Sequence, residues 1–209
     1  MSAEPDIDAC LPKRGPLLIV LSGPSGVGKD AILARMRRLH GDFHYTVTTT
    51  TRSCRPQERD GVDYCFVPTE RFQQMIADGE FMEWAQVYGN WYGVPKSQVR
   101  DALARGQDVF IKTDVQGAAT IKRIAPQGIF IFVAPRSFSE LEHRIRLRHA
   151  EADFDLSLRL ATARDELQRL PLFDYVVINP EGQLDCAIRH IESIIEAEKC
   201  RVSPRIVEV

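Results

Sequence analysis

The sequence has few cysteines, little net charge and no long apolar run, and each shortage excludes a class of protein. Its 209 residues include five cysteines without a Cys-x-x-Cys pair, which argues against a disulfide framework and favours reduced thiols in a cytoplasmic protein. The net charge of −2 gives no basic field that would indicate nucleic acid as a partner. No apolar run approaches the length of a membrane span. Residues 1–14 contain three acidic residues and no apolar core, so no secretory signal is expected there.

Strands alternate with helices over most of the chain. Apolar runs predict strands at 17–22, 108–113, 128–133 and 174–178, and helical spacing of apolar residues predicts helices at 30–39, 96–105, 117–124, 137–148, 155–169 and 184–198. This alternation predicts an α/β fold with a parallel sheet covered by helices on both faces. A segment rich in Thr and Tyr, residues 43–93, interrupts the alternation and predicts a small mixed lobe, with strands expected at 43–51, 62–67, 80–88 and 91–93.

A glycine-rich segment with one lysine lies between the first predicted strand and the first predicted helix. It reads Gly23-Pro24-Ser25-Gly26-Val27-Gly28-Lys29-Asp30. This is the context of a phosphate-binding loop, in which backbone N–H groups surround phosphate oxygens and the lysine reaches the β- and γ-phosphates. A glycine-rich turn with an incidental lysine is the alternative. Ser or Thr normally follows the lysine and binds magnesium, but here that position is Asp30.

The predicted lobe carries a second group of polar residues. Arg52 and Arg55 lie three positions apart among hydroxyl residues, and a planar guanidinium fork suits a phosphate. Tyr64 and Tyr92 can add hydroxyl donors, and the Glu83 carboxylate can accept the ring N–H and the exocyclic amine of a guanine. Singly, such residues are usually solvated surface charges. Together, and with a phosphate-binding loop, they predict a second nucleotide site.

Arginines also gather between residues 143 and 159. Arg144 and Arg148 lie four apart on one predicted helix, and Arg159 lies on the next. Phosphoryl transfer requires cations over the migrating group and the exclusion of water, usually by a closing segment. The arrangement predicts a helical lid over 137–169, the alternative being a surface helix coated with arginine.

The run from Leu17 to Lys199 resembles the guanylate kinase family, whose members phosphorylate GMP with ATP. The motifs that carry the resemblance are Thr50-Thr51-Arg52-x-x-Arg55-x-x-Glu58-x-x-Gly61-x-Asp63-Tyr64-x-Phe66-Val67, Phe81-Met82-Glu83, Gly89-Asn90-x-Tyr92-Gly93, Asp114-Val115-Gln116-Gly117 and Asp174-Tyr175-Val176-Val177-x-Asn179. The resemblance implies a P-loop kinase with an N-terminal extension 1–14, a kinase domain 15–199 and a tail 200–209. Within the domain it implies a core (15–42, 94–136 and 170–199), a GMP-binding lobe (43–93) and a lid (137–169).

The resemblance also implies roles for individual residues. Arg52, Arg55, Tyr64 and Tyr92 would hold the phosphate of GMP, and Thr48, Glu83 and Asp114 would bind its guanine. Residues 23–30 would bind ATP, which carries Mg²⁺. Catalysis would depend on Lys29, Arg52 and the lid arginines Arg144, Arg148 and Arg159. The partners implied are the small molecules ATP and GMP.

Three positions depart from the family pattern. Val94 and Pro95 follow Tyr-Gly where the family usually has a hydroxyl residue, Lys112 replaces an acid, and Asp30 replaces the P-loop hydroxyl. Since the last two lie side by side in a P-loop kinase, we predict an Asp30–Lys112 salt bridge, with magnesium held mainly by phosphates and water. Direct ligation of magnesium by Asp30 is the alternative.

Two other families share parts of this pattern. Gly-Lys-Asp and Tyr-Gly-Val are similar to ribose 1,5-bisphosphate phosphokinase, which lacks the complete arginine, tyrosine and glutamate set found in this chain. Non-catalytic protein-binding modules share the guanylate kinase fold but have lost a working phosphate loop, whereas this chain keeps Lys29 and the lid arginines. Guanylate kinase activity is therefore the prediction, and these two are its alternatives.

Overall fold

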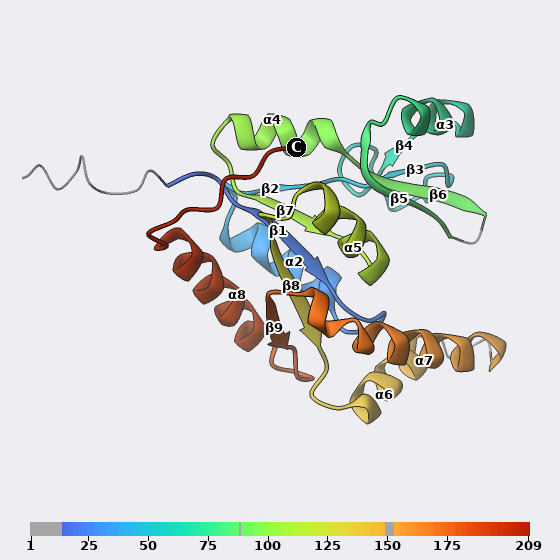
Figure 1. Cartoon of the computed structure of the whole chain (residues 1–209). Coiled ribbons are helices and arrows are strands. Elements are labelled where there is room, and N and C mark those ends of the chain that lie inside the picture. The colour runs from blue at the N-terminus through green and yellow to red at the C-terminus, as the bar shows by residue number, and fades with distance from the viewer. Residues whose placement is uncertain (1–13, 88, 149–152) are drawn as a thin grey trace, which may run out of the picture.

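The protein is built on a parallel five-stranded sheet (Figure 1). The structure, a computed structural model, describes residues 14–87, 89–148 and 153–209, without the side chains of residues 148 and 153–155. The strand order is β2 (His44–Tyr45), β7 (Val109–Lys112), β1 (Leu18–Ser22), β8 (Ile129–Ala134), β9 (Tyr175–Ile178). Every neighbouring pair runs parallel, so the predicted parallel sheet is confirmed.

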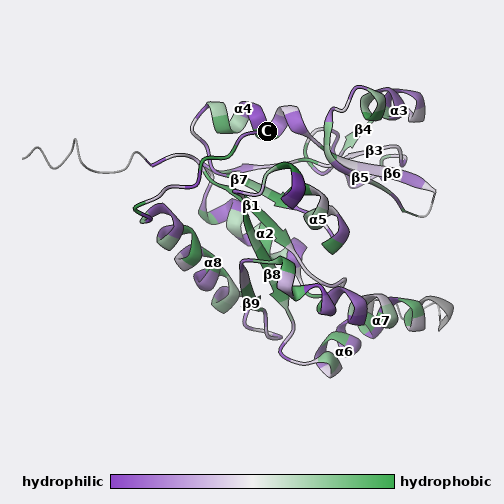
Figure 2. Cartoon of the chain, viewed as in Figure 1, coloured by the Kyte–Doolittle hydropathy of each residue, from purple (hydrophilic) through white to green (hydrophobic). Residues whose placement is uncertain are grey.

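The central strand β1 is apolar on both faces because helices cover both. Ile19 and Leu21 contribute to a core with α2 (Lys29–Leu39) and α8 (Leu184–Lys199). Leu18 and Val20 contribute to a second core with α4 (Lys96–Ala104) and α5 (Val115–Ile124). Figure 2 shows the hydrophobic colour along the central strands and more hydrophilic colour on the outer helices. Burial on both faces explains why these strands read as continuous apolar runs.

A second sheet forms the small lobe. Its order is β4 (Cys65–Phe66), β3 (Thr49–Thr50), β6 (Asn90–Pro95), β5 (Phe81–Val87). The β3–β4 pair is parallel and the other pairs are antiparallel, as expected for a mixed lobe. Helix α3 (Thr69–Ala77) covers it through a core of Phe72, Met75 and Phe81. Helices α6 (Phe138–Arg148) and α7 (Asp153–Gln168) lie together at another end of the core (Figure 1), and a short 3-10 turn, η1 (Leu170–Leu172), follows them.

The single strand predicted over 43–51 was wrong, because this segment is divided between the two sheets. Thr46 still donates its backbone N–H to Phe110 of the central sheet, 3.0 Å away, whereas the Thr48 carbonyl accepts from Cys65 of the lobe at 2.9 Å. At Val47, between them, the Gln98 side chain takes the place of a strand partner, with one hydrogen bond to the backbone N–H and one to the carbonyl (2.8 and 2.9 Å). The strand predicted over 62–67 is shortened to Cys65–Phe66.

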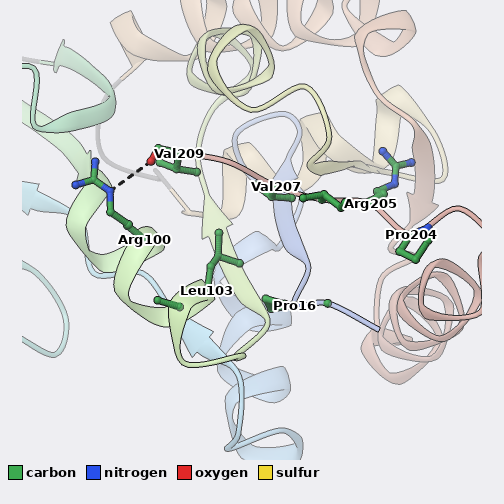
Figure 3. Close-up of a pocket in the computed structure, with 10 residues that line it drawn as sticks. Pro16, Arg100, Leu103, Pro204, Arg205, Val207 and Val209 are labelled. Carbon is green, nitrogen blue, oxygen red and sulfur yellow. Dashed lines mark hydrogen bonds between the residues drawn. The ribbon is translucent and has the colours of Figure 1, made fainter. Parts of the chain in front are cut away.

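The segment 200–209 runs back across the core. Val207 and Val209 pack against the cluster under α4. Figure 3 shows the cavity of about 620 Å³ that this segment forms with Pro16 and Leu103, where Arg100 donates a hydrogen bond to the Val209 carbonyl at 3.3 Å. Within the described ranges, no helix combines the length and the apolar character required to cross a bilayer.

Glu198 anchors this segment, and we expect Arg205→Ala to destabilise the fold. Glu198 is 2% exposed, and the Arg205 guanidinium donates to both its carboxylate oxygens at 2.8 Å. Removing one partner of a buried pair costs about 3–5 kcal/mol. We expect about 2–3 kcal/mol here, because Tyr175 remains hydrogen-bonded to the same carboxylate at 2.6 Å. Urea unfolding measures the change. Arg201→Ala is the control, since Arg201 lies 3.6 Å from Glu198 and is 48% exposed; equal losses in both variants would contradict the prediction.

Candidate active site

The glycine-rich loop lies between β1 and α2, as predicted. Two of its glycines are required by close contacts: a Cβ on Gly23 would lie 2.2 Å from the Val133 carbonyl oxygen, and one on Gly28 would lie 2.5 Å from Asn179 Nδ2. Both have positive φ angles, 139° and 98°, which side chains disfavour. The loop therefore curls tightly at the N-terminus of an 11-residue helix, where backbone N–H groups and the helix dipole favour a phosphate.

Lys29 is the first residue of α2 and folds back over the loop. Its ammonium group donates to the carbonyl oxygens of Gly23 at 2.5 Å and Pro24 at 3.0 Å. Burial lowers the pKa of Lys29 to about 8, although the neighbouring Glu166 and Asp30 carboxylates oppose this. The lysine is thus held as a cation, at neutral pH, beside the phosphate-binding backbone.

Asn179, the last residue of the motif Asp174-Tyr175-Val176-Val177-x-Asn179, holds the loop from the far end of the chain. Its side-chain amide donates to the Val27 carbonyl at 2.8 Å. Arg144, which was predicted to belong to a lid, donates to the same carbonyl at 3.3 Å and to the Asn179 carbonyl at 2.9 Å, and its guanidinium also contacts Glu140. Arg144 thus lies against the phosphate-binding loop.

The lobe presents an arginine held by a carboxylate and aromatic rings. Glu58 accepts two hydrogen bonds from the Arg52 guanidinium, at 2.8 and 2.9 Å, and this pairing lowers the pKa of Glu58 to about 2. The guanidinium lies over the Tyr64 ring, 5.1 Å from its centroid. The Tyr92 ring meets the Tyr64 ring edge-on, with the two centroids 6.2 Å apart. Arg55 lies on the exposed loop nearby, with its backbone N–H donating to Glu58 at 2.9 Å. Four residues predicted to bind one phosphate are thus neighbours.

Glu83 lies on β5 where the lobe meets α5. Thr113 donates a hydrogen bond to its Oε1 atom at 3.1 Å. Asp114 is the N-cap of α5, with Oδ1 accepting the Gly117 N–H at 2.7 Å. Burial, and then the charge of Asp114, raise the pKa of Glu83 to about 7. Two of the three residues predicted to bind guanine, Glu83 and Asp114, therefore influence each other electrostatically.

A cavity of about 240 Å³ joins the loop side to the lobe. Asp30 and Lys112 line it from the core, and Thr48, Glu58 and Tyr64 line it from the lobe. One residue predicted to bind ATP, Asp30, and two predicted to bind GMP, Thr48 and Tyr64, thus line the same cavity.

Comparisons with known proteins identify this arrangement. The family model described as guanylate kinase matches residues 16–198. The chain belongs to the guanylate kinase family. It is 46% identical to guanylate kinase 2, chloroplastic/mitochondrial, of Oryza sativa subsp. japonica over 95% of this chain and 70% of that protein. It is 41% identical to the guanylate kinase of Carboxydothermus hydrogenoformans over 88% and 90%. The crystal structure of guanylate kinase from Anaplasma phagocytophilum superimposes with a TM-score of 0.70 at 30% identity, covering 92% of this chain and 90% of that one.

This guanylate kinase contains the salt bridge predicted from its departures from the family pattern. Lys112 Nζ lies 2.5 Å from Asp30 Oδ1, so the pairing is confirmed. The other substituted position, Val94, is fully buried in the core beneath the lobe. It offers no hydroxyl to a substrate.

We expect the Asp30–Lys112 pair to neutralise an anion beside the ATP phosphates. Lys112→Met removes the cation that faces the Asp30 carboxylate and should weaken binding of metal-free ATP about tenfold, a value discounted because both side chains are partly exposed. Asp30→Asn/Lys112→Met should bind ATP within about threefold of the wild type. Calorimetry on the four proteins of the cycle measures this. Additive single effects would show that the two side chains act independently.

The structure describes part of the segment predicted to be a lid, residues 137–169. Arg159 is half-buried on α7, and the Arg148 side chain lies outside the described residues. The same helix brings Glu166, which the sequence analysis did not select, toward Lys29. One of its carboxylate oxygens is buried without a hydrogen-bond partner. Burial raises the pKa of Glu166, and the Lys29 charge opposes this rise. No motif spacing marked Glu166; its approach to Lys29 follows from the packing of α7.

The raised pKa of Glu83 predicts a pH-dependent affinity for GMP. Guanine N–H donors favour the ionised carboxylate, so affinity should be full above pH 7 and fall about tenfold per pH unit below it. The Michaelis constant for GMP between pH 5.5 and 8.5 measures this. Glu83→Gln is the control. Its profile should show only the second ionisation of the GMP phosphate, with a pKa of about 6. A flat wild-type profile would contradict the prediction.

Proposed function

We propose that this guanylate kinase transfers the γ-phosphoryl group of ATP to GMP, producing ADP and GDP for purine nucleotide metabolism. The observation that carries the proposal is the cavity that residues of the P-loop helix and of the lobe line together, among them Asp30, Thr48 and Tyr64. A phosphate loop alone fits any P-loop enzyme. A second anion site beside it fits an acceptor that is itself a phosphate ester.

The residues would divide the reaction between binding and electrostatic stabilisation. Lys29 would stabilise negative charge on the transferring phosphoryl group, together with the lid arginines Arg144, Arg148 and Arg159. Arg52, Arg55, Tyr64 and Tyr92 would hold the acceptor phosphate in line with the donor. Thr48, Glu83 and Asp114 would bind the guanine. Direct transfer between two bound nucleotides requires no covalent enzyme intermediate.

Magnesium would enter with ATP. In the described part of the chain, no three carboxylate, histidine or cysteine side chains converge into a metal site. Mg²⁺ commonly binds through substrate phosphates, water and one or two carboxylates, and Asp30, 65% exposed beside Lys29, fits the role of an acceptor for a metal-bound water. When bound, the ion would neutralise charge between the β- and γ-phosphates. Cys54, Cys65, Cys186 and Cys200 are unpaired thiols, which supports a reducing compartment such as the cytoplasm as the proposed location.

A panel of acceptors tests the proposal. The purified protein is assayed with MgATP and GMP, AMP, UMP or ribose 1,5-bisphosphate. Because Glu83 would lose its donor partners with adenine, we expect kcat/KM for GMP to exceed that for AMP by at least about 100-fold. Glu83→Gln should erode this preference. Equal turnover of AMP would disprove the assignment, turnover of ribose 1,5-bisphosphate alone would support the phosphokinase alternative, and no turnover would support a binding module.

A further inference from the structure

Thr113 joins the catalytic core to the nucleotide-binding lobe through one hydrogen bond. It follows β7 directly and is 8% exposed. Its hydroxyl donates to Glu83 Oε1 at 3.1 Å, across a separation of 30 residues. Among the described side chains, Thr113 is the one that donates a hydrogen bond to this carboxylate. Thr113 is not among the residues predicted to bind either nucleotide.

The packing around Thr113 leaves this contact little freedom. Gly117 lies in the first turn of α5, where an added Cβ would be 2.1 Å from Thr113 Oγ1 and 3.0 Å from Glu83 Oε2. Asp114 caps the same helix through the Gly117 N–H at 2.7 Å. The absence of a side chain at Gly117 therefore leaves the space in which the hydroxyl and the carboxylate meet.

The surroundings of Glu83 make this single donor important. Burial disfavours the charged carboxylate, and Asp114, at the start of α5, repels it. The Thr113 hydrogen bond is the interaction that favours the charged form, as expected for a donor directed at a carboxylate. A guanine can be bound through two N–H donors only while the carboxylate is ionised and correctly oriented.

We propose that Thr113 is a positioning residue for acceptor specificity, holding the Glu83 carboxylate in the orientation and charge state that bind the guanine of GMP. This inference rests on the proposed function. Thr113 acts through Glu83 and has no assigned contact with the substrate. Acceptor specificity would then depend on Glu83 in the lobe and also on Thr113, which follows β7 of the core.

Thr113→Val removes the hydroxyl and keeps the branched shape, and so provides the test. We expect the Michaelis constant for GMP at pH 7 to rise about tenfold, the loss expected for a hydrogen bond to a charged group. The constant for ATP should stay within about twofold. The midpoint of the GMP pH profile should move up by about one pH unit, because the ionised form loses its donor. Thr113→Ser should restore both values.

Three controls separate the possible outcomes. In the Glu83→Gln background, Thr113→Val should have less than about a third of its effect, since its partner has changed. Thr120→Val removes an α5 hydroxyl that contacts Arg123 at 3.2 Å and should leave the GMP profile unchanged. Thr113→Ala replaces the valine variant if that variant fails to fold. An unchanged midpoint, or failure of serine to restore it, would overturn the proposal, whereas absence of GMP turnover in the wild type would instead overturn the proposed function.

Discussion

Lys29→Met should lower kcat for phosphoryl transfer by about 100- to 1,000-fold, the loss typical of removing one group that stabilises transition-state charge. The substitution keeps most of the apolar stem and removes the ammonium group that lies at 2.5 Å from the Gly23 carbonyl. Steady-state kinetics with saturating GMP and MgATP measure the effect. GMP binding, followed by calorimetry, should remain unchanged, because the acceptor lobe does not use this lysine.

The pH dependence of ATP binding provides a second measurement on the same residue. Because burial lowers the pKa of Lys29 to about 8 in the nucleotide-free protein, affinity for ATP should be full below pH 8 and decline above it. Lys29→Met should abolish that decline. A variant that retained the wild-type kcat or the same alkaline decline would show that the titrating cation lies elsewhere.

Arg52→Ala should raise the Michaelis constant for GMP by about 100-fold or more and leave that for ATP nearly unchanged. A bidentate guanidinium–phosphate contact is strong. In the wild type the Glu58 carboxylate lies 2.8 Å from the Arg52 guanidinium. Removal of Arg52 would therefore also leave Glu58 facing the acceptor phosphate as an uncompensated anion. Loss of a charged hydrogen-bonding group accounts for about 1.5–3 kcal/mol. Arg52→Lys should recover only part of the affinity, because lysine keeps the charge and loses the fork.

Arg71→Ala is the matched control for this variant. Arg71 belongs to the same lobe and pairs with Glu80 at 3.3 Å, but its side chain is 52% exposed, so both Michaelis constants should stay within about twofold of the wild type. If Arg52→Ala raised both constants together, the arginine would be a structural support for the whole lobe.

The sequence by itself determined the fold class and the phosphate-binding loop. Apolar strands buried on both faces, helices with an apolar stripe and a glycine-rich turn leave local patterns that are visible without coordinates. The helix and strand ends of the core agree with those predictions within a few residues. The Asp30–Lys112 pair, separated by 82 residues, was also predictable, because both residues replace family residues at two positions that lie side by side in a P-loop kinase. A second nucleotide site followed from the grouping of arginine, tyrosine and glutamate residues, whereas the role of each residue toward guanine or phosphate depended on the resemblance to a family.

Only the tertiary structure decided which distant side chains meet. Asn179 reaches the P-loop across 152 residues, Thr113 meets Glu83 across 30, and Glu166 approaches Lys29 through the packing of α7. The division of 43–51 between two sheets depends on Gln98, which replaces a strand partner at Val47. None of these contacts follows from residue spacing, because burial and hydrogen bonding between segments far apart in the chain depend on how the two sheets pack and override local strand propensity.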